Sequence, residues 1–155
     1  FLIISKKTFM KKLFLVGFVA VLATSTMMTS CSKYDEGSKF TLLTKKSRVI
    51  NEWNLVSMTQ DGTALNMTGL VVTSKFSKDG TYSTTTAYTL LGQTYTDTVT
   101  GTWSFSDDKT KLLTIQTGTT VTGEWTIIQL AKDDMKLSQF DAANNSTTIT
   151  VWATK

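Results

Sequence analysis

The chain has 155 residues, a formal net charge of +4, no histidine and one cysteine. Histidine is the commonest general base and metal ligand, and thiolates are the usual soft ligands, so zinc sites and histidine-assisted nucleophilic catalysis are excluded for this sequence. A disulfide within one chain is excluded as well.

The basic excess lies at the N-terminal end. Four of the sixteen Lys and Arg residues lie upstream of Cys31, which leaves twelve basic against twelve acidic residues in the rest of the chain. A protein that follows a phosphate backbone needs a retained basic stripe. The charge distribution therefore predicts no nucleic-acid partner.

The first thirty residues have the pattern of a secretory signal. Met10-Lys11-Lys12 is positively charged, and Leu13 to Ala23 is an apolar run. This run is too short to cross a hydrocarbon core of about 30 Å as a helix. We expect residues 1–30 to be a signal peptide, with residues 1–9 an over-extended start before the natural Met10.

A lipidation signal follows directly. Met28-Thr29-Ser30-Cys31 resembles a bacterial lipobox, in which an aliphatic residue and two small ones precede the lipid-accepting cysteine. The resemblance implies acyl chains on Cys31, and two or more chains hold a protein stably on a bilayer. Residues 31–39 are then a lipidated, flexible tether. Because Ser32 follows the cysteine, we expect an outer-membrane lipoprotein of a Gram-negative bacterium, either periplasmic or surface-exposed.

Residues 40–155 are predicted to form one domain that begins with a short helix. Apolar residues between Phe40 and Ile50 recur at roughly helical spacing, so we expect this stretch to cap one end of the domain. Threonine then alternates with apolar and aromatic residues, as in half-buried strands. The alternation predicts eight strands: Asn51–Thr59, Leu70–Ser77, Thr81–Leu90, Thr94–Ser106, Lys111–Thr117, Val121–Leu130, Met135–Phe140 and Thr147–Thr154.

Connections of hairpin length, marked by turn residues, separate these strands. The sheet should therefore be an antiparallel up-and-down meander. Across a turn at Leu91-Gly92, Tyr88 should face Tyr95, and Tyr82 should cover Gly101.

The later hairpins carry three further register predictions. A three-residue turn, Gly118-Thr119-Thr120, would set Ile115 against Gly123 and Leu113 against Trp125. The same parity places Gln129 opposite Met135, and Gln139 opposite Ile149.

Four segments carry a family resemblance: Asn51-Glu52-Trp53 near the start of the first strand, and residues 76–82, 101–105 and 125–130. They are similar to the lipocalin-like lipoproteins of Bacteroidetes over about Leu42 to Lys155. The resemblance implies an all-β fold, an eight-stranded antiparallel up-and-down barrel with a short N-terminal capping helix.

The alternation places Asp97 on the inward face, beside Tyr88 and Tyr95. A carboxylate inside a barrel is costly unless it is hydrogen-bonded or solvated. Asp97 is therefore either a solvated side chain near the open end of the barrel or the polar anchor of a ligand pocket. Tryptophans are expected to fill the other end, so the cavity should lie at the threonine-rich end. The candidate ligand-binding residues are Tyr82, Thr84, Thr86, Tyr88, Tyr95 and Asp97.

Two pairs of adjacent carboxylates, Asp107-Asp108 and Asp133-Asp134, lie at expected hairpin turns. Aspartate is a standard turn residue, and calcium loops space their ligands at alternate positions. We interpret both pairs as structural and expect no metal or other cofactor.

Two functions fit these predictions. The first is a lipid-anchored barrel that binds a small apolar or amphipathic ligand. The alternative is a structural or interaction lipoprotein whose packed barrel docks on an envelope partner. Trp152 motivates the alternative, because it is expected to point outward with Thr148, Thr150 and Thr154. An enzyme is not expected, because no pair of acidic, lysine or tyrosine side chains is suitably arranged.

Overall fold

The computed structural model describes residues 43–155. The predicted signal peptide, Cys31, the tether and residues 40–42 of the expected helix lie outside the described residues. The described strands form one sheet, which lies within the compact unit Ser32–Lys155.

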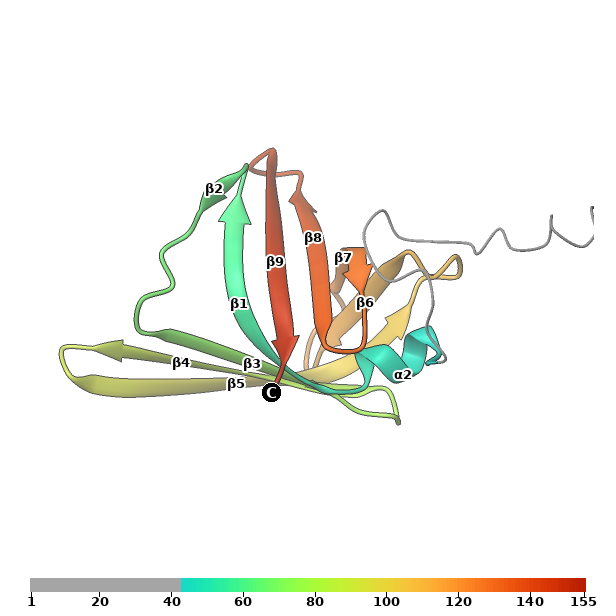
Figure 1. The fold of residues 1–155 in the computed structure, drawn as a ribbon, viewed down its shortest axis with the longest axis horizontal. Coiled ribbons are helices and arrows are strands. Elements are labelled where there is room, and N and C mark those ends of the chain that lie inside the picture. The colour runs from blue at the N-terminus through green and yellow to red at the C-terminus, as the bar shows by residue number, and fades with distance from the viewer. Residues whose placement is uncertain (1–42) are drawn as a thin grey trace, which may run out of the picture. The chain divides into compact units, whose positions relative to one another are not determined.

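The described part of the chain contains one helix followed by β-strands (Figure 1). The helix is α2, Lys45–Val49. The strands are β1 Glu52–Gln60, β2 Thr63–Ala64, β3 Leu70–Phe76, β4 Thr81–Leu90, β5 Gln93–Phe105, β6 Lys111–Gln116, β7 Thr122–Leu130, β8 Asp134–Asp141 and β9 Ser146–Thr154.

Eight of the strands close into an antiparallel barrel. Successive strands from β3 to β9 pair with one another, β1 pairs with β3, and β1 also pairs with β9 to close the ring. The two-residue strand β2 was not predicted, and it pairs with the end of β1. The prediction of an all-β, eight-stranded, up-and-down barrel with a short capping helix is confirmed.

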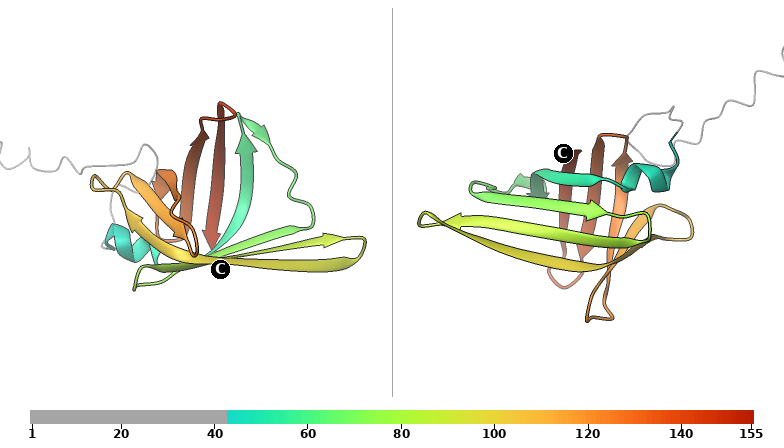
Figure 2. Two further views of the ribbon diagram at one scale, coloured as in Figure 1. Left: turned by 180° about the vertical axis from the view of Figure 1, so that it is seen from behind. Right: turned by 90° about the horizontal axis from the view of Figure 1, so that it is seen from below.

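The ladders around the barrel differ greatly in length. Strands β4 and β5 pair from Thr81↔Thr102 to Leu90↔Gln93 and form a long arm that is plain in Figure 2. Strands β1 and β3 pair only from Glu52↔Lys75 to Asn54↔Thr73. Strand β1 also pairs with β9, from Trp53↔Thr154 to Gln60↔Thr148, and beyond Asn54 this is its only pairing within the barrel. The contact between β1 and β3 is therefore a short seam in a ring of longer ladders.

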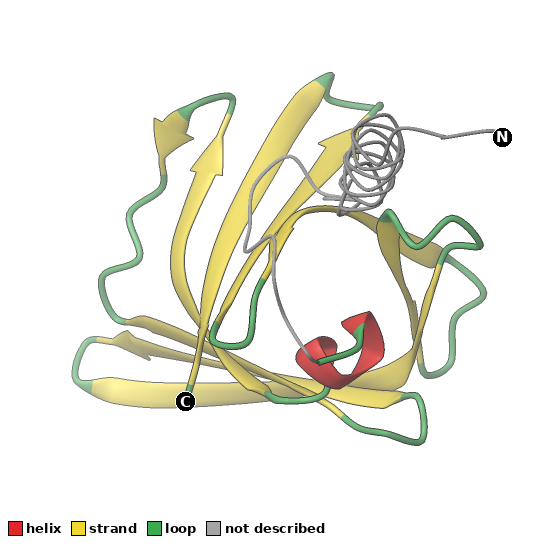
Figure 3. Cartoon of the chain, turned by 45° about the vertical axis from the view of Figure 1, so that its right-hand side comes forward, coloured by secondary structure: helices red, strands yellow, loops and turns green. Residues whose placement is uncertain are grey.

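Helix α2 lies across one end of the barrel (Figure 3). It begins at Thr44, whose hydroxyl accepts a hydrogen bond from the Ser47 amide at 3.1 Å, as an N-cap residue should. Val49 is fully buried, and its carbonyl accepts a hydrogen bond from the Trp53 indole at 2.9 Å. The buried Arg48 guanidinium donates to the Leu130 carbonyl. These contacts hold the helix against the strands and close this end.

The hydrophobic core gathers at the end that α2 closes. Phe76 and Trp103 meet edge to face, with ring centroids 5.8 Å apart, which is a favoured aromatic geometry. The buried cluster consists of Val49, Trp53, Phe76, Trp103, Leu112, Ile127, Leu130, Met135 and Leu137.

The predicted register of the first long hairpin is confirmed. Tyr88 faces Tyr95 and Tyr82 faces Gly101. The two-residue turn places Leu91 at φ 51° and Gly92 at φ 77°. Positive φ at both positions matches the right-handed twist of the flanking strands.

Three register predictions are wrong by one residue. Thr114, and not Ile115, faces Gly123, because the connection between β6 and β7 runs from residue 117 to residue 121.

The second and third errors lie in the last two hairpins. In β7, a bulge between Ile127 and Gln129 sets Gln129 against Lys136, although Ile127↔Leu137 keeps the expected parity. A four-residue turn before β9 places Ser138, and not Gln139, opposite Ile149. Because side chains alternate along a strand, each one-residue error exchanges the inward and outward faces.

Candidate functional site

The barrel contains a cavity of about 400 Å³ that is partly open to solvent. This volume falls within the range of small-molecule sites, about 300–1,000 Å³. Strands β1 and β3 to β9 contribute to its wall: Leu55, Met58, Val72, Ser74, Phe76, Tyr82, Thr84, Thr86, Val99, Leu112, Thr114, Trp125, Met135, Leu137, Thr150 and Trp152. The interior is therefore not filled by side chains, contrary to the packed barrel of the alternative hypothesis.

Aromatic rings form the part of the wall that is nearest to the core. The Phe76 and Tyr82 rings stack at 6.0 Å, and the Tyr82 ring lies over Gly101, where a Cβ atom would come within 2.7 Å of the tyrosine Cε1 atom. The predicted aromatic cover of Gly101 is confirmed. Burial raises the pKa of the Tyr82 hydroxyl, so this group is neutral at physiological pH.

Hydroxyl groups form a row on the wall that β3 and β4 share. Ser74 faces Thr84 across the ladder, and their hydroxyl oxygens lie 2.8 Å apart. Thr86, two residues further along β4, faces Val72. We call Ser74, Thr84 and Thr86 the hydroxyl row. Hydroxyls both donate and accept hydrogen bonds, so the row can bind a ligand group that accepts a hydrogen bond or one that donates it.

Trp152 faces the cavity, so its predicted outward orientation is wrong. It is half-buried, and its indole nitrogen donates to the Thr150 hydroxyl at 2.9 Å. Thr150 is only 1 % exposed. The ladder pairs Trp152 with Met135 and Thr150 with Leu137, and all four residues line the cavity. The feature that motivated a docking role for Trp152 is therefore absent.

The structure divides the six predicted ligand-binding residues into two groups. Tyr82, Thr84 and Thr86 line the cavity. Tyr88 and Tyr95 lie further along the arm, where their rings stack at 5.2 Å and each is 45 % exposed. Asp97 pairs with Thr86, is exposed and does not line the cavity. The cavity thus lies deeper than the predicted threonine-rich end, and ligand binding by any of these residues stays a prediction.

Several wall residues were not identified from the sequence. Ser74 and Val72 share the inward face of β3 with Phe76, so strand parity alone would have found them. Trp125 was assigned inward, but to the core only. Thr114, Thr150 and Trp152 were missed because their hairpins were given the wrong register.

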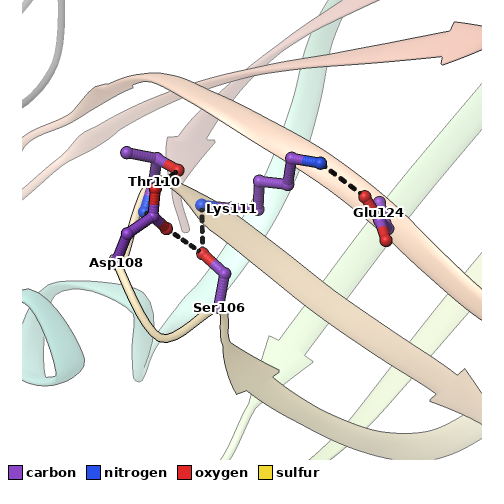
Figure 4. Close-up of polar contacts among 5 residues, drawn as sticks. All are labelled: Ser106, Asp108, Thr110, Lys111 and Glu124. Atoms are coloured by element: carbon purple, nitrogen blue, oxygen red, sulfur yellow. Dashed lines mark hydrogen bonds and ion pairs between the residues drawn. The ribbon is translucent and has the colours of Figure 1, made fainter.

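One member of each carboxylate pair, Asp108 and Asp133, makes a structural hydrogen bond beside a hairpin turn, whereas Asp134 is the first residue of β8. Asp108 accepts hydrogen bonds from the Thr110 amide at 3.0 Å and the Ser106 hydroxyl at 2.6 Å, which closes the turn between β5 and β6 (Figure 4). In the second pair, the Asp133 carboxylate accepts a longer hydrogen bond from the Thr154 hydroxyl at 3.5 Å. Residues 43–155 contain no group of three or more metal-ligating acidic side chains.

The other perturbed groups belong to the barrel surface and its turns. The Lys111 ammonium lies 2.6 Å from the Glu124 carboxylate, which raises the lysine pKa (Figure 4). A backbone hydrogen bond from Thr81 lowers the pKa of the Asp79 carboxyl in the turn before β4. Surface ion pairs and turn acids of this kind contribute little stability and do not line the cavity.

No helix among the described residues is long and apolar enough to cross a membrane.

No family model and no curated protein matches the sequence. Solved structures do match. Japanin from Rhipicephalus appendiculatus, bound to cholesterol, has a TM-score of 0.50 and 14 % identity, over 68 % of this chain and 74 % of that one. A bovine odorant-binding protein from nasal mucosa has a TM-score of 0.43 and 12 % identity, over 75 % and 77 % of the two chains. At these identities the similarity is one of fold, and the fold is a lipocalin-like barrel.

Proposed function

We propose that this chain is a lipid-anchored, lipocalin-like protein of the bacterial envelope that holds a small apolar or amphipathic molecule in its barrel, without catalysis. One observation carries the binding role: a cavity of about 400 Å³ whose wall is mainly apolar, with a few hydroxyl groups, among them the hydroxyl row. A largely apolar cavity with a few convergent polar groups is typical of small-molecule sites. Japanin, which was solved with cholesterol, has a similar fold.

Two properties of the cavity favour binding over a purely structural role. An eight-stranded barrel is just wide enough either to be filled by its side chains or to hold one small ligand. Here large residues fill the end under α2, whereas Val72, Ser74, Thr84 and Val99 leave space further along. Aromatic and aliphatic groups in the wall would gain about 25 cal/mol for each Å² of apolar surface that a ligand covers.

The lipid anchor is a separate part of the proposal. Met28-Thr29-Ser30-Cys31 supports acylation of Cys31, and Ser32 supports an outer-membrane location, with the barrel on the periplasmic or the cell-surface side. The resemblance to lipocalin-like lipoproteins of Bacteroidetes supports the same assignment.

The binding role is tested by obstructing the cavity from one strand of its wall. Val99 lines the cavity, whereas its neighbour Thr98 points outward and is exposed. In residues 32–155, Val99→Trp should weaken binding of the uncharged dye N-phenyl-1-naphthylamine by at least about tenfold, because the indole occupies the ligand's space. Thr98→Trp, the matched control, should leave dye affinity unchanged.

The measurement is a fluorescence titration of each protein, with circular dichroism to show that both variants are folded. If the parent protein does not bind the dye, or if both tryptophan variants bind it as the parent does, the cavity is not a binding site.

A further inference from the structure

The charge of the cavity wall restricts what the cavity can hold. None of its sixteen lining residues has a side chain that is ionised at neutral pH. Tyr82 is the one titratable residue among them, and burial raises its pKa further. A ligand group that enters this space meets apolar surface and neutral hydroxyls.

Most charged residues of the surrounding strands lie on the outer face. They alternate with inward residues along their strands: Glu52 on β1, Lys75 on β3, Lys111 on β6, Glu124 on β7, and Asp134 and Lys136 on β8. Asp141 ends β8 in the inward parity, but it is exposed, does not line the cavity, and its carboxylate accepts hydrogen bonds from Ala143 and Asn144 in the next turn. Asp97 follows the inward face of β5 but lies beyond the cavity and is exposed. Arg48 lies in α2 at the closed end, and its guanidinium donates to the Leu130 carbonyl. Arg48 is absent from the cavity wall, so it offers a bound anion no direct partner there. The acid Asp97 would repel an anion and is absent from the wall as well.

The hydroxyl row supplies the polar contacts. The Ser74 and Thr84 hydroxyls share one hydrogen bond, so one of their two O–H groups is still able to donate. The Thr86 hydroxyl makes no hydrogen bond to another described residue, although Thr86 lines the cavity. Neutral donors and acceptors of this kind match a hydroxyl or carbonyl group. They do not offset the large cost of removing an ionised carboxylate from water.

We propose that the barrel selects uncharged amphiphiles, molecules with an apolar chain or ring and a hydroxyl or carbonyl head that binds the hydroxyl row, and that it rejects the corresponding carboxylates. This selectivity rests on the proposed ligand-binding role and deepens it. A free fatty acid enters the cavity in its protonated form, so its affinity is low at neutral pH. The alcohol of the same chain length is uncharged, so its binding requires no loss of an ionised group's hydration.

The test compares two ligands that differ in the head group alone. Decan-1-ol and decanoate each displace N-phenyl-1-naphthylamine from residues 32–155, and their apparent affinities are measured between pH 7.5 and pH 5.5. We expect decan-1-ol to bind at least about tenfold more tightly than decanoate at pH 7. Decanoate affinity should rise about tenfold for each pH unit of acidification, following the protonated fraction of a carboxyl whose pKa is about 4–5. Decan-1-ol affinity should stay constant.

A pair of variants tests the hydroxyl row. Thr86→Val removes the hydroxyl and keeps the shape of the side chain, so decan-1-ol affinity should fall about twofold to tenfold, the effect of one lost hydrogen bond. The decan-1-ol effect is expressed relative to any change in dye affinity of the same variant. Thr85→Val removes a hydroxyl from the outer face of the same strand, where Thr85 bonds Thr98 at 3.1 Å, and it should leave both affinities unchanged.

The outcomes separate the two proposals. Equal or tighter binding of decanoate at pH 7, with normal dye binding, overturns the selectivity and leaves the ligand-binding role intact. Equal effects of the two valine variants on decan-1-ol would show that the hydroxyl row does not hold the head group. Absence of binding by the dye and by both ligands overturns the selectivity and the proposed function together.

Discussion

Gly101 lies in β5, with the ring of Tyr82 across it and the carbonyl of Ile115 close to where a Cβ atom would stand. The Ile115 carbonyl belongs to the backbone of β6 and cannot rotate away as a side chain does. The Tyr82 ring is also confined, because it stacks on Phe76 and forms part of the cavity wall. A single missing Cβ thus lets three neighbouring strands approach one another.

We expect Gly101→Ala to lower the free energy of unfolding by about 2 kcal/mol or more, because the new methyl group overpacks this contact. Urea unfolding followed by tryptophan fluorescence measures the change. Gly123→Ala is the matched control, since its Cβ would meet the Thr114 hydroxyl at 2.7 Å, a side-chain group that can rotate. The free energy of unfolding should fall clearly less in Gly123→Ala than in Gly101→Ala. Equal losses in the two variants would contradict the role given to the Ile115 carbonyl.

Among residues 43–155, the single element outside the sheet is α2, and its start depends on Thr44. The Thr44 hydroxyl accepts a hydrogen bond from the Ser47 amide. The turn that follows places the Val49 carbonyl where it accepts a hydrogen bond from the Trp53 indole. A helix of five residues is too short to be stable alone, so capping and packing together must hold it.

Thr44→Ala should therefore lower the free energy of unfolding by about 1 kcal/mol, the usual effect of losing an N-cap side chain. Thr44→Ser keeps the hydroxyl acceptor and should stay close to the parent protein. Thermal unfolding of residues 32–155 distinguishes the two variants. A Thr44→Ser variant as unstable as Thr44→Ala would show that the threonine methyl group matters, and not the cap.

The register of individual hairpins shows how far the sequence determined the strands. The Leu91-Gly92 turn has two residues, so the parity of β4 and β5 followed directly and placed Tyr82, Thr84 and Thr86 correctly. Glycine and asparagine elsewhere marked where turns occur, but not how many residues each contains. A one-residue error in the pairing register exchanges the inward and outward faces of the whole strand. Thr114 and Trp152 were therefore assigned to the wrong face.

At the scale of the whole molecule, the alternation of threonine with apolar residues was sufficient to predict eight strands and their order. The position of the cavity was not predictable in the same way. It depends on how the side-chain volumes of eight strands add up across the barrel, and no local pattern contains that sum. Ser74 and Val99, for example, come from strands that both neighbour β4 but do not pair with each other.

The proposed anchor makes a prediction about the full chain in its cell. Cells that are fed an alkyne-tagged fatty acid should incorporate the tag into the protein, and the protein should sediment with the outer membrane. Cys31→Ser should lose both the tag and the membrane association, whereas Ser32→Ala should keep the tag. A tagged Cys31→Ser variant would place acylation elsewhere, and an untagged parent protein would contradict the anchor.

The three residue pairs between β1 and β3 have a consequence for how the barrel exchanges its contents. Few hydrogen bonds must break to separate these strands, whereas opening the ring at β4 and β5 would break a ladder more than three times as long. Local opening at such a place requires less free energy than global unfolding. Leu55 and Val72, which line the cavity, are the chain neighbours of the last pair, Asn54↔Thr73, on its unpaired side. The residence time of a bound molecule would then depend on this seam and be largely independent of the stability of the rest of the fold.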